Sequence, residues 1–96
     1  MSEFKRHNFK KLLIWQMGME VSKVILVITE SFPISEKYGL KSQMDRCCIS
    51  TPSNIAEGSS RTNKSFSHFL DIALGSSFEL QTQILLANHR NYLSNE

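Results

Sequence analysis

The segment FPISEKYGLKSQMDRCCISTPSNIAEG, from Phe32 to Gly58, decides how this chain folds. Pro33 disfavours helical geometry at the residue before it, so any helix that precedes the segment is predicted to end there. Ser42, with Asp45 three positions later, resembles a capping box and predicts that a second helix begins at this serine. Gly58 is predicted to end that helix, because glycine adopts the left-handed conformation at little cost.

A proline interrupts the predicted second helix. Pro52 has no amide hydrogen, and its ring clashes with the carbonyl group of Cys48 four residues earlier. We therefore predict a kinked helix at this point. Two shorter helices, split at Thr51, are the alternative.

Helical periodicity extends to both sides of this segment. A first helix is predicted from about Asn8, as its N-cap, to about Thr29. Its apolar stripe consists of Phe9, Leu12, Leu13, Met17, Val21, Val24, Ile25 and Ile28. A long third helix is predicted to begin after Thr62 or Asn63. Its inner stripe consists of Phe66, Phe69, Leu70, Ala73, Leu80, Ile84 and Ala87, and the small residues Gly75 and Ser76 are expected to let another helix approach closely.

These patterns predict an all-α fold, an antiparallel up-and-down helical bundle, as a single domain over residues 1–96 with a basic N-terminal arm at residues 1–8. No strand-length alternation lies between the few prolines and glycines. Three residues follow Leu93, so a fourth helix is predicted to be short or missing. Three helices would leave an apolar groove, for which self-association is the simplest cover.

The composition sets further bounds. The chain has 96 residues and a formal net charge of +2, which does not demand a polyanionic partner. Cys47 and Cys48 are adjacent, so a disulfide between them would be strained, and a reducing, cytoplasmic setting is expected. Polar residues interrupt the apolar stretch from Leu12 to Ile28, so neither a signal peptide nor a membrane span is expected.

The segment and its surroundings resemble a known family signature, namely the small bacterial four-helix-bundle proteins of 23S rRNA intervening sequences. The resemblance rests on Phe32-Pro33, Glu36, Tyr38-Gly39-Leu40, Gln43, Arg46, Ser50, Pro52, Asn54-Ile55-Ala56-Glu57-Gly58, Phe66, Phe69-Leu70, Ile72-Ala73, Gly75-Ser76, Glu79-Leu80 and Gln83. It implies a homo-oligomer, typically a pentamer. Related members are accessory proteins of diversity-generating retroelements, which associate with nucleic acid and a reverse transcriptase, so the resemblance also implies those two partners.

Basic residues gather at the N-terminus. Residues 1–11 hold four basic groups and one acid, Glu3, whereas acids slightly exceed bases in the rest of the chain. Such a short run is commonly a solvated helix start. The functional interpretation is a phosphate-contacting surface that is repeated around an oligomer. Its candidate nucleic-acid-binding residues are Lys5, Arg6, Lys10, Lys11, Arg61 and Lys64.

A polar line runs along the second helix. Its members, separated by three or four residues and therefore on one face, are Gln43, Arg46, Ser50, Asn54 and Glu57. This line is either a solvated face or a hydrogen-bond network between helices or subunits, which would fix their register. If Arg46 is buried it needs an acid, and Glu79 is the first candidate and Glu57 the second.

Catalytic chemistry finds little support. His7, His68 and His89 share no metal-ligand spacing with one another or with the cysteines. No nucleophile with an adjacent base is recognisable, so we expect no enzyme activity, metal or cofactor. Two functions remain, a homo-oligomer associated with RNA or DNA and a protein-interaction scaffold. Salt should separate them, because counterion release weakens nucleic-acid binding steeply as salt rises.

Overall fold

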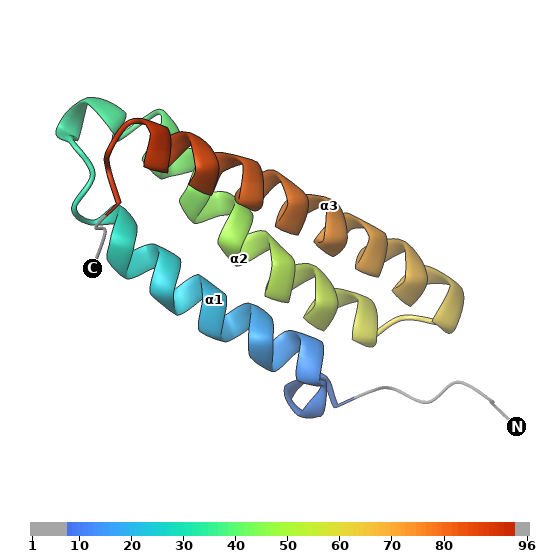
Figure 1. The fold of residues 1–96 in the computed structure, drawn as a ribbon. Helices are drawn as coiled ribbons and strands as arrows, with labels where there is room; N and C mark the ends of the chain where they lie inside the picture. Colours follow the sequence, from blue (N-terminus) through green and yellow to red (C-terminus); the bar gives the residue numbers. More distant parts are fainter. Residues whose placement is uncertain (1–7, 94–96) are drawn as a thin grey trace, which may run out of the picture.

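Three α-helices and two short 3-10 helices make up the part of the chain that the computed structural model describes, residues 8–93. The elements are η1 (Phe9–Lys11), α1 (Leu13–Thr29), η2 (Ile34–Glu36), α2 (Leu40–Ser59) and α3 (Asn63–His89). No strand occurs within residues 8–93. The predicted all-helical fold is therefore confirmed (Figure 1).

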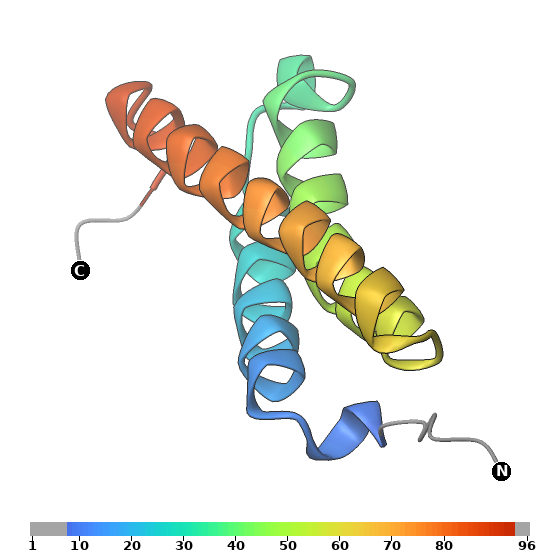
Figure 2. The same ribbon diagram turned by 90° about the vertical axis from the view of Figure 1, so that its right-hand side faces the viewer.

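Helix α2 lies between the other two helices. Consecutive helices run in opposite directions, and α1 and α3 flank α2 in Figure 1. No Cα atom of α1 comes within 8 Å of a Cα atom of α3. Figure 2 shows α3 crossing the pair formed by α1 and α2 obliquely. The bundle is therefore open on the side where α1 and α3 would meet.

The start of the first helix differs from the prediction. Asn8 caps η1 instead of α1, because its Oδ1 accepts a hydrogen bond from Lys10 N at 3.2 Å. Leu12 is extended, with φ −74° and ψ 125°, so the chain turns before α1 begins at Leu13. The predicted start at Asn8 is wrong for this reason, whereas the end of α1 at Thr29 is confirmed.

Helix α2 begins two residues earlier than predicted. The carboxylate of Glu36 accepts a hydrogen bond from Leu40 N at 3.0 Å, so an acid outside the helix takes the capping role expected of Ser42. The helix continues through Pro52 to Ser59. The alternative of two helices split at Thr51 is wrong.

Gly58 does not end α2 by adopting a left-handed conformation. It lies inside the helix, and no glycine among the described residues has a positive φ. A methyl group on its Cα would lie 2.6 Å from Cβ of Phe69, so α3 crosses α2 here with no room for a side chain. The predicted cap at Thr62 is confirmed, because its hydroxyl oxygen accepts from Ser65 N at 3.3 Å.

The core lies where the three helices and the turn after α1 converge. Its buried members are Ile25, Phe32, Met44, Cys47, Cys48, Leu80 and Ala87. Both cysteines are free and buried, as small apolar residues would be, and burial raises the pKa of each thiol. Both cysteines therefore fill the core as small apolar side chains.

A hydrogen bond fixes the segment after α3 to the turn between α1 and α2. Tyr92, which follows α3, donates to Glu36 Oε2 at 2.8 Å, and its ring packs on Phe32 with centroids 5.1 Å apart. Asn91 makes this reversal possible with φ 61°, a left-handed conformation that asparagine tolerates. The contact connects the segment after α3 to the turn before α2.

Removing this hydroxyl is expected to destabilise the fold in a pH-dependent manner. Hydrogen bonds from Leu40 N and Tyr92 lower the pKa of Glu36, and the bond to Glu36 raises the pKa of Tyr92. The stabilisation is therefore complete from about pH 4.5 to about pH 10; it is lost as pH falls through the lowered pKa or rises through the raised one. Urea unfolding of Tyr92→Phe should show a deficit at pH 7 that shrinks at pH 3. A deficit of the same size at both pH values would contradict this assignment.

Candidate nucleic-acid interface

The candidate nucleic-acid-binding residues within residues 8–93 lie at one end of the bundle. Lys10 and Lys11 lie on η1, whereas Arg61 and Lys64 lie at the turn between α2 and α3. Antiparallel packing brings the start of α1 and this turn to the same end (Figure 1), and η1 contacts α2. All four residues are exposed. We call these four residues the basic end; the predicted Lys5 and Arg6 lie outside the described residues.

The four basic groups differ in their availability. Arg61 forms an ion pair with Glu57 at 2.5 Å, and its guanidinium lies 5.4 Å from the centroid of the Phe69 ring. The ammonium groups of Lys10, Lys11 and Lys64 form no ion pair with any described residue. Helices α1 and α3 begin at this end and α2 ends here, so two positive helix ends face one negative one and the net potential of the helix dipoles is positive. Lys10 Nζ lies 6.0 Å from the centroid of the Phe9 ring, but the side chain is exposed. The three lysines are therefore the basic groups here whose charge no described acid neutralises.

The centre of the predicted polar line joins two helices. Ser50 on α2 and Ser76 on α3 share a hydrogen bond of 3.0 Å between their hydroxyl oxygens. Asn54 Nδ2 donates to the carbonyl oxygen of Ser50 at 2.8 Å and to its hydroxyl oxygen at 2.9 Å. Ser50 and Asn54 therefore belong to an interhelical network, as predicted. Gly75, by contrast, would have no atom of another helix within 4 Å of a methyl group added to its Cα, so its expected close approach is not made within the described residues.

The outer members of the line remain at the surface. Gln43, Arg46 and Glu57 are exposed, and so is Glu79 on α3. Arg46 forms no ion pair with either predicted acid within residues 8–93. Glu57 binds Arg61 one turn later instead. The predicted partnership applied only to a buried Arg46, and that condition is not met within the described residues, because Arg46 is exposed to solvent. A role for Arg46 between subunits stays a prediction.

Gln83 is a further buried polar residue of α3, on the same helix face as Ser76, and it was not among the predicted polar residues. The residue is only 4% exposed, and its Oε1 has no partner among the described residues. Its Nε2 lies 3.5 Å from Glu79 Oε2, at the limit of a hydrogen bond. The sequence signal was present, because Ser76 and Gln83 are seven residues apart and share a helix face.

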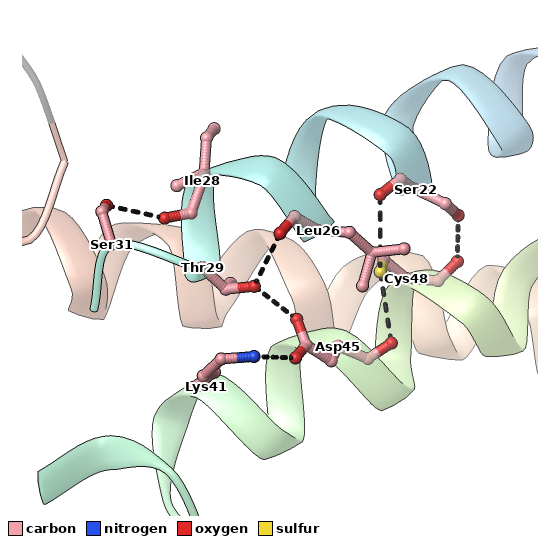
Figure 3. Close-up of polar contacts among 8 residues, drawn as sticks. All are labelled: Ser22, Leu26, Ile28, Thr29, Ser31, Lys41, Asp45 and Cys48. Atoms are coloured by element: carbon pink, nitrogen blue, oxygen red, sulfur yellow. Dashed lines mark hydrogen bonds and ion pairs between the residues drawn. The ribbon is translucent and has the colours of Figure 1, made fainter. Parts of the chain in front are cut away.

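A second polar cluster, which sequence reasoning missed, holds α1 against α2 (Figure 3). The Thr29 hydroxyl donates to Asp45 Oδ1 at 2.6 Å, and Lys41 Nζ lies 2.8 Å from Asp45 Oδ2. About two turns earlier on α1, the Ser22 hydroxyl donates to the Cys48 carbonyl oxygen at 2.5 Å. The available signal was the spacing of Gly18, Ser22, Ile25 and Thr29 at intervals of four, three and four residues.

These contacts turn the predicted apolar stripe of α1 away from α2. Of that stripe only Ile25 is buried, and the other buried residues of α1 are Ser22 and Thr29. Helix α1 therefore lines an open groove of about 470 Å³ between itself and α3. The groove is lined by Ile14, Met17, Gly18, Val21, Cys48, Thr51, Ile55, Leu70, Asp71, Ala73, Leu74, Ser77 and Leu80. The uncovered apolar groove predicted from the sequence is confirmed.

Clusters of metal-ligating side chains and membrane-spanning helices are both absent from residues 8–93. No group of three or more histidine, cysteine or acidic side chains is placed to hold a metal ion in this part of the chain. Within the same range, every helix is too short or too polar to cross a membrane.

Comparison with known proteins identifies one family. A family model described as the 23S rRNA-intervening sequence protein matches residues 10–96, which is nearly the whole chain. The family predicted from the sequence signature is thereby confirmed. Comparison with curated proteins yields no match.

Proposed function

We propose that this chain, which belongs to the family of 23S rRNA-intervening sequence proteins, is a non-catalytic homo-oligomeric bundle that associates with nucleic acid. The observation that supports the proposal is the basic end, where Lys10, Lys11 and Lys64 are exposed and unpaired within residues 8–93. Lysines contact phosphate oxygens without reading base sequence. Association through RNA or DNA backbone is therefore the expected mode.

Oligomerisation would strengthen a surface that is weak in one copy. Each chain offers few phosphate contacts, and several copies on one nucleic acid bind with a high effective concentration. Five copies, a reverse transcriptase as protein partner and a cytoplasmic location belong to the same proposal. The family resemblance supports the first two, and the free, buried cysteines are compatible with a reducing compartment.

The experiment compares two double variants with the same change in charge. Lys10 and Lys64 are replaced by glutamine in the first, and the exposed Lys37 and Arg90 in the control. Binding of a fluorescent single-stranded RNA is measured by anisotropy from 50 to 200 mM salt. The first variant should bind less tightly and show a salt slope smaller by about 1.4, since each lost contact removes about 0.7. Equal weakening by both variants would refute a localised basic end.

A protein-interaction scaffold is the alternative function. The observation that favours it is the number of large apolar side chains left exposed on all three helices. Apolar association persists or strengthens as salt rises, unlike contacts with phosphate. A wild-type chain that fails to bind RNA even at 50 mM salt, while forming stable assemblies, would establish the scaffold in place of the nucleic-acid function.

A further inference from the structure

Helix α1 exposes more apolar side chains than it buries. Two of its three buried residues carry hydroxyl groups, as described above. Leu13, Met17, Val24 and Val27 are 57–68% exposed, and together they form the outer face of α1. Glu20 shares this face by its spacing, and its carboxylate is paired with Lys23 Nζ at 3.2 Å. A helix that is apolar on nearly every side is normally enclosed by other helices. The outer face therefore has the character of a surface that another protein element covers.

The groove between α1 and α3 is a second uncovered surface. Ile14 and Val21 enter it from α1, Leu70 and Leu74 from α3, and Ile55 forms part of its floor. The axes of packed helices lie 8–10 Å apart, a spacing that brings some of their Cα atoms within 8 Å of one another. No Cα atom of α1 is within 8 Å of a Cα atom of α3, so these two helices do not pack together. The groove is therefore a concave apolar site of the kind that receives an amphipathic helix.

We propose that the outer face of α1 of one copy packs into the groove of a second copy. This inference extends the homo-oligomeric part of the proposed function, and it does not depend on nucleic-acid binding. The convex surface and the concave one occur on the same chain, and both are mainly apolar, with one acid in each (Glu20 and Asp71). A second copy thus supplies the missing partner for each surface.

The charges of α1 and of the groove favour a second copy of the chain as the partner. The only charged residues in α1 are Glu20 and Lys23, whose side chains pair at 3.2 Å, so the helix brings no net charge to the contact. Asp71 is the only charged residue among the described residues that line the groove. A nearly neutral helix therefore enters a nearly neutral groove, whereas a polyanion would meet apolar side chains and a carboxylate.

The two surfaces are different, so the contact is heterologous. Each copy can offer its outer face to one neighbour and its groove to another. Such contacts produce a closed ring when the rotation from each copy to the next adds up to a full turn. Met17 borders both surfaces, and the remaining residues of the outer face do not line the groove. One surface can therefore be changed while the other is left intact.

Two single variants test the contact. Val24→Glu places a charge on the outer face, and Leu74→Glu places one in the groove; both side chains are more than half exposed, so the chain should still fold. Ser53→Glu adds the same charge to an exposed position of α2 that belongs to neither surface, as a control. Mass is measured by light scattering without nucleic acid, and helix content by circular dichroism. The wild type and the control should form the same oligomer, and each test variant should be a helical monomer of 11.0 kDa.

Mixing the two variants tests the direction of the contact. The Val24→Glu copy keeps an intact groove, and the Leu74→Glu copy keeps an intact outer face, so an equimolar mixture should form a heterodimer with twice the monomer mass. A monomeric wild type, an unchanged oligomer in either variant, or a mixture that stays monomeric would each overturn the proposal. The RNA measurements described above are separate, so failure of one proposal is distinguishable from failure of the other.

Discussion

Replacing Gly58 by alanine is expected to destabilise the fold by about 2 kcal/mol, the range typical of overpacking a buried contact. The added methyl group would lie 2.6 Å from Cβ of Phe69 and 3.0 Å from Cδ1 of Phe66. Cβ of Phe69 is fixed to the backbone of α3, so rotation of its side chain cannot relieve the clash. Alanine favours a helix over glycine by about 1 kcal/mol, but separation of α2 from α3 should outweigh this gain.

The same substitution at Gly75 provides a matched control. Gly75 also lies inside a helix, but no atom outside its own helix lies within 4 Å of the added methyl group. Gly75→Ala should therefore stabilise the chain by up to about 1 kcal/mol through helix propensity alone. Urea unfolding of both variants measures the contrast. Two changes of the same sign and size would show that the contact between Gly58 and Phe69 does not set the spacing of the helices.

Replacing Met44 by alanine is expected to have a still larger effect, a loss of about 2–5 kcal/mol. Met44 is completely buried, and it lies in the core cluster with Ile25, Phe32 and Leu80. Truncation would remove apolar burial and leave a cavity that the helices, held by interhelical hydrogen bonds, can fill only in part. A loss of this size is a large share of the 5–15 kcal/mol that stabilises a typical domain.

Met44→Leu is the control for that prediction. It conserves the side-chain volume and should lower the stability by less than about 1.5 kcal/mol. Chemical unfolding of both variants at pH 7, followed by circular dichroism, gives the comparison. If alanine proves no worse than leucine, the packed centre of the molecule lies elsewhere.

Local sequence was enough to predict the elements, because their signals act over a few residues. The three helices follow from apolar residues at helical spacing, and Thr62 caps α3 through a bond to an amide three residues away. Boundaries were less accurate where the capping group came from outside the helix. Glu36 reaches Leu40 N from a preceding turn, which a search for a cap at Ser42 does not find.

The candidate site was predictable only in part. The exposure of Lys10, Lys11 and Lys64 follows from their charge, since burial of an unpaired ammonium group is unfavourable. The pair formed by Ser50 and Ser76 lies on two helices, and only the Ser50 side was recognised in the polar line. Whether Arg46 is buried could not be read from the sequence, because the spacing of a polar face does not show how much of that face another helix covers; the residue is exposed.

The sequence by itself determined that the chain is helical, which family it belongs to, and that an apolar groove would remain uncovered. Periodicity and local capping carry that information along one chain segment at a time. Only the tertiary structure decided that Ser22 and Thr29 face α2, that Gly58 is a crossing point, and that Lys10 and Lys64 share an end. Each of these depends on contacts between residues far apart in sequence, where hydrogen bonding and steric fit override the apolar pattern.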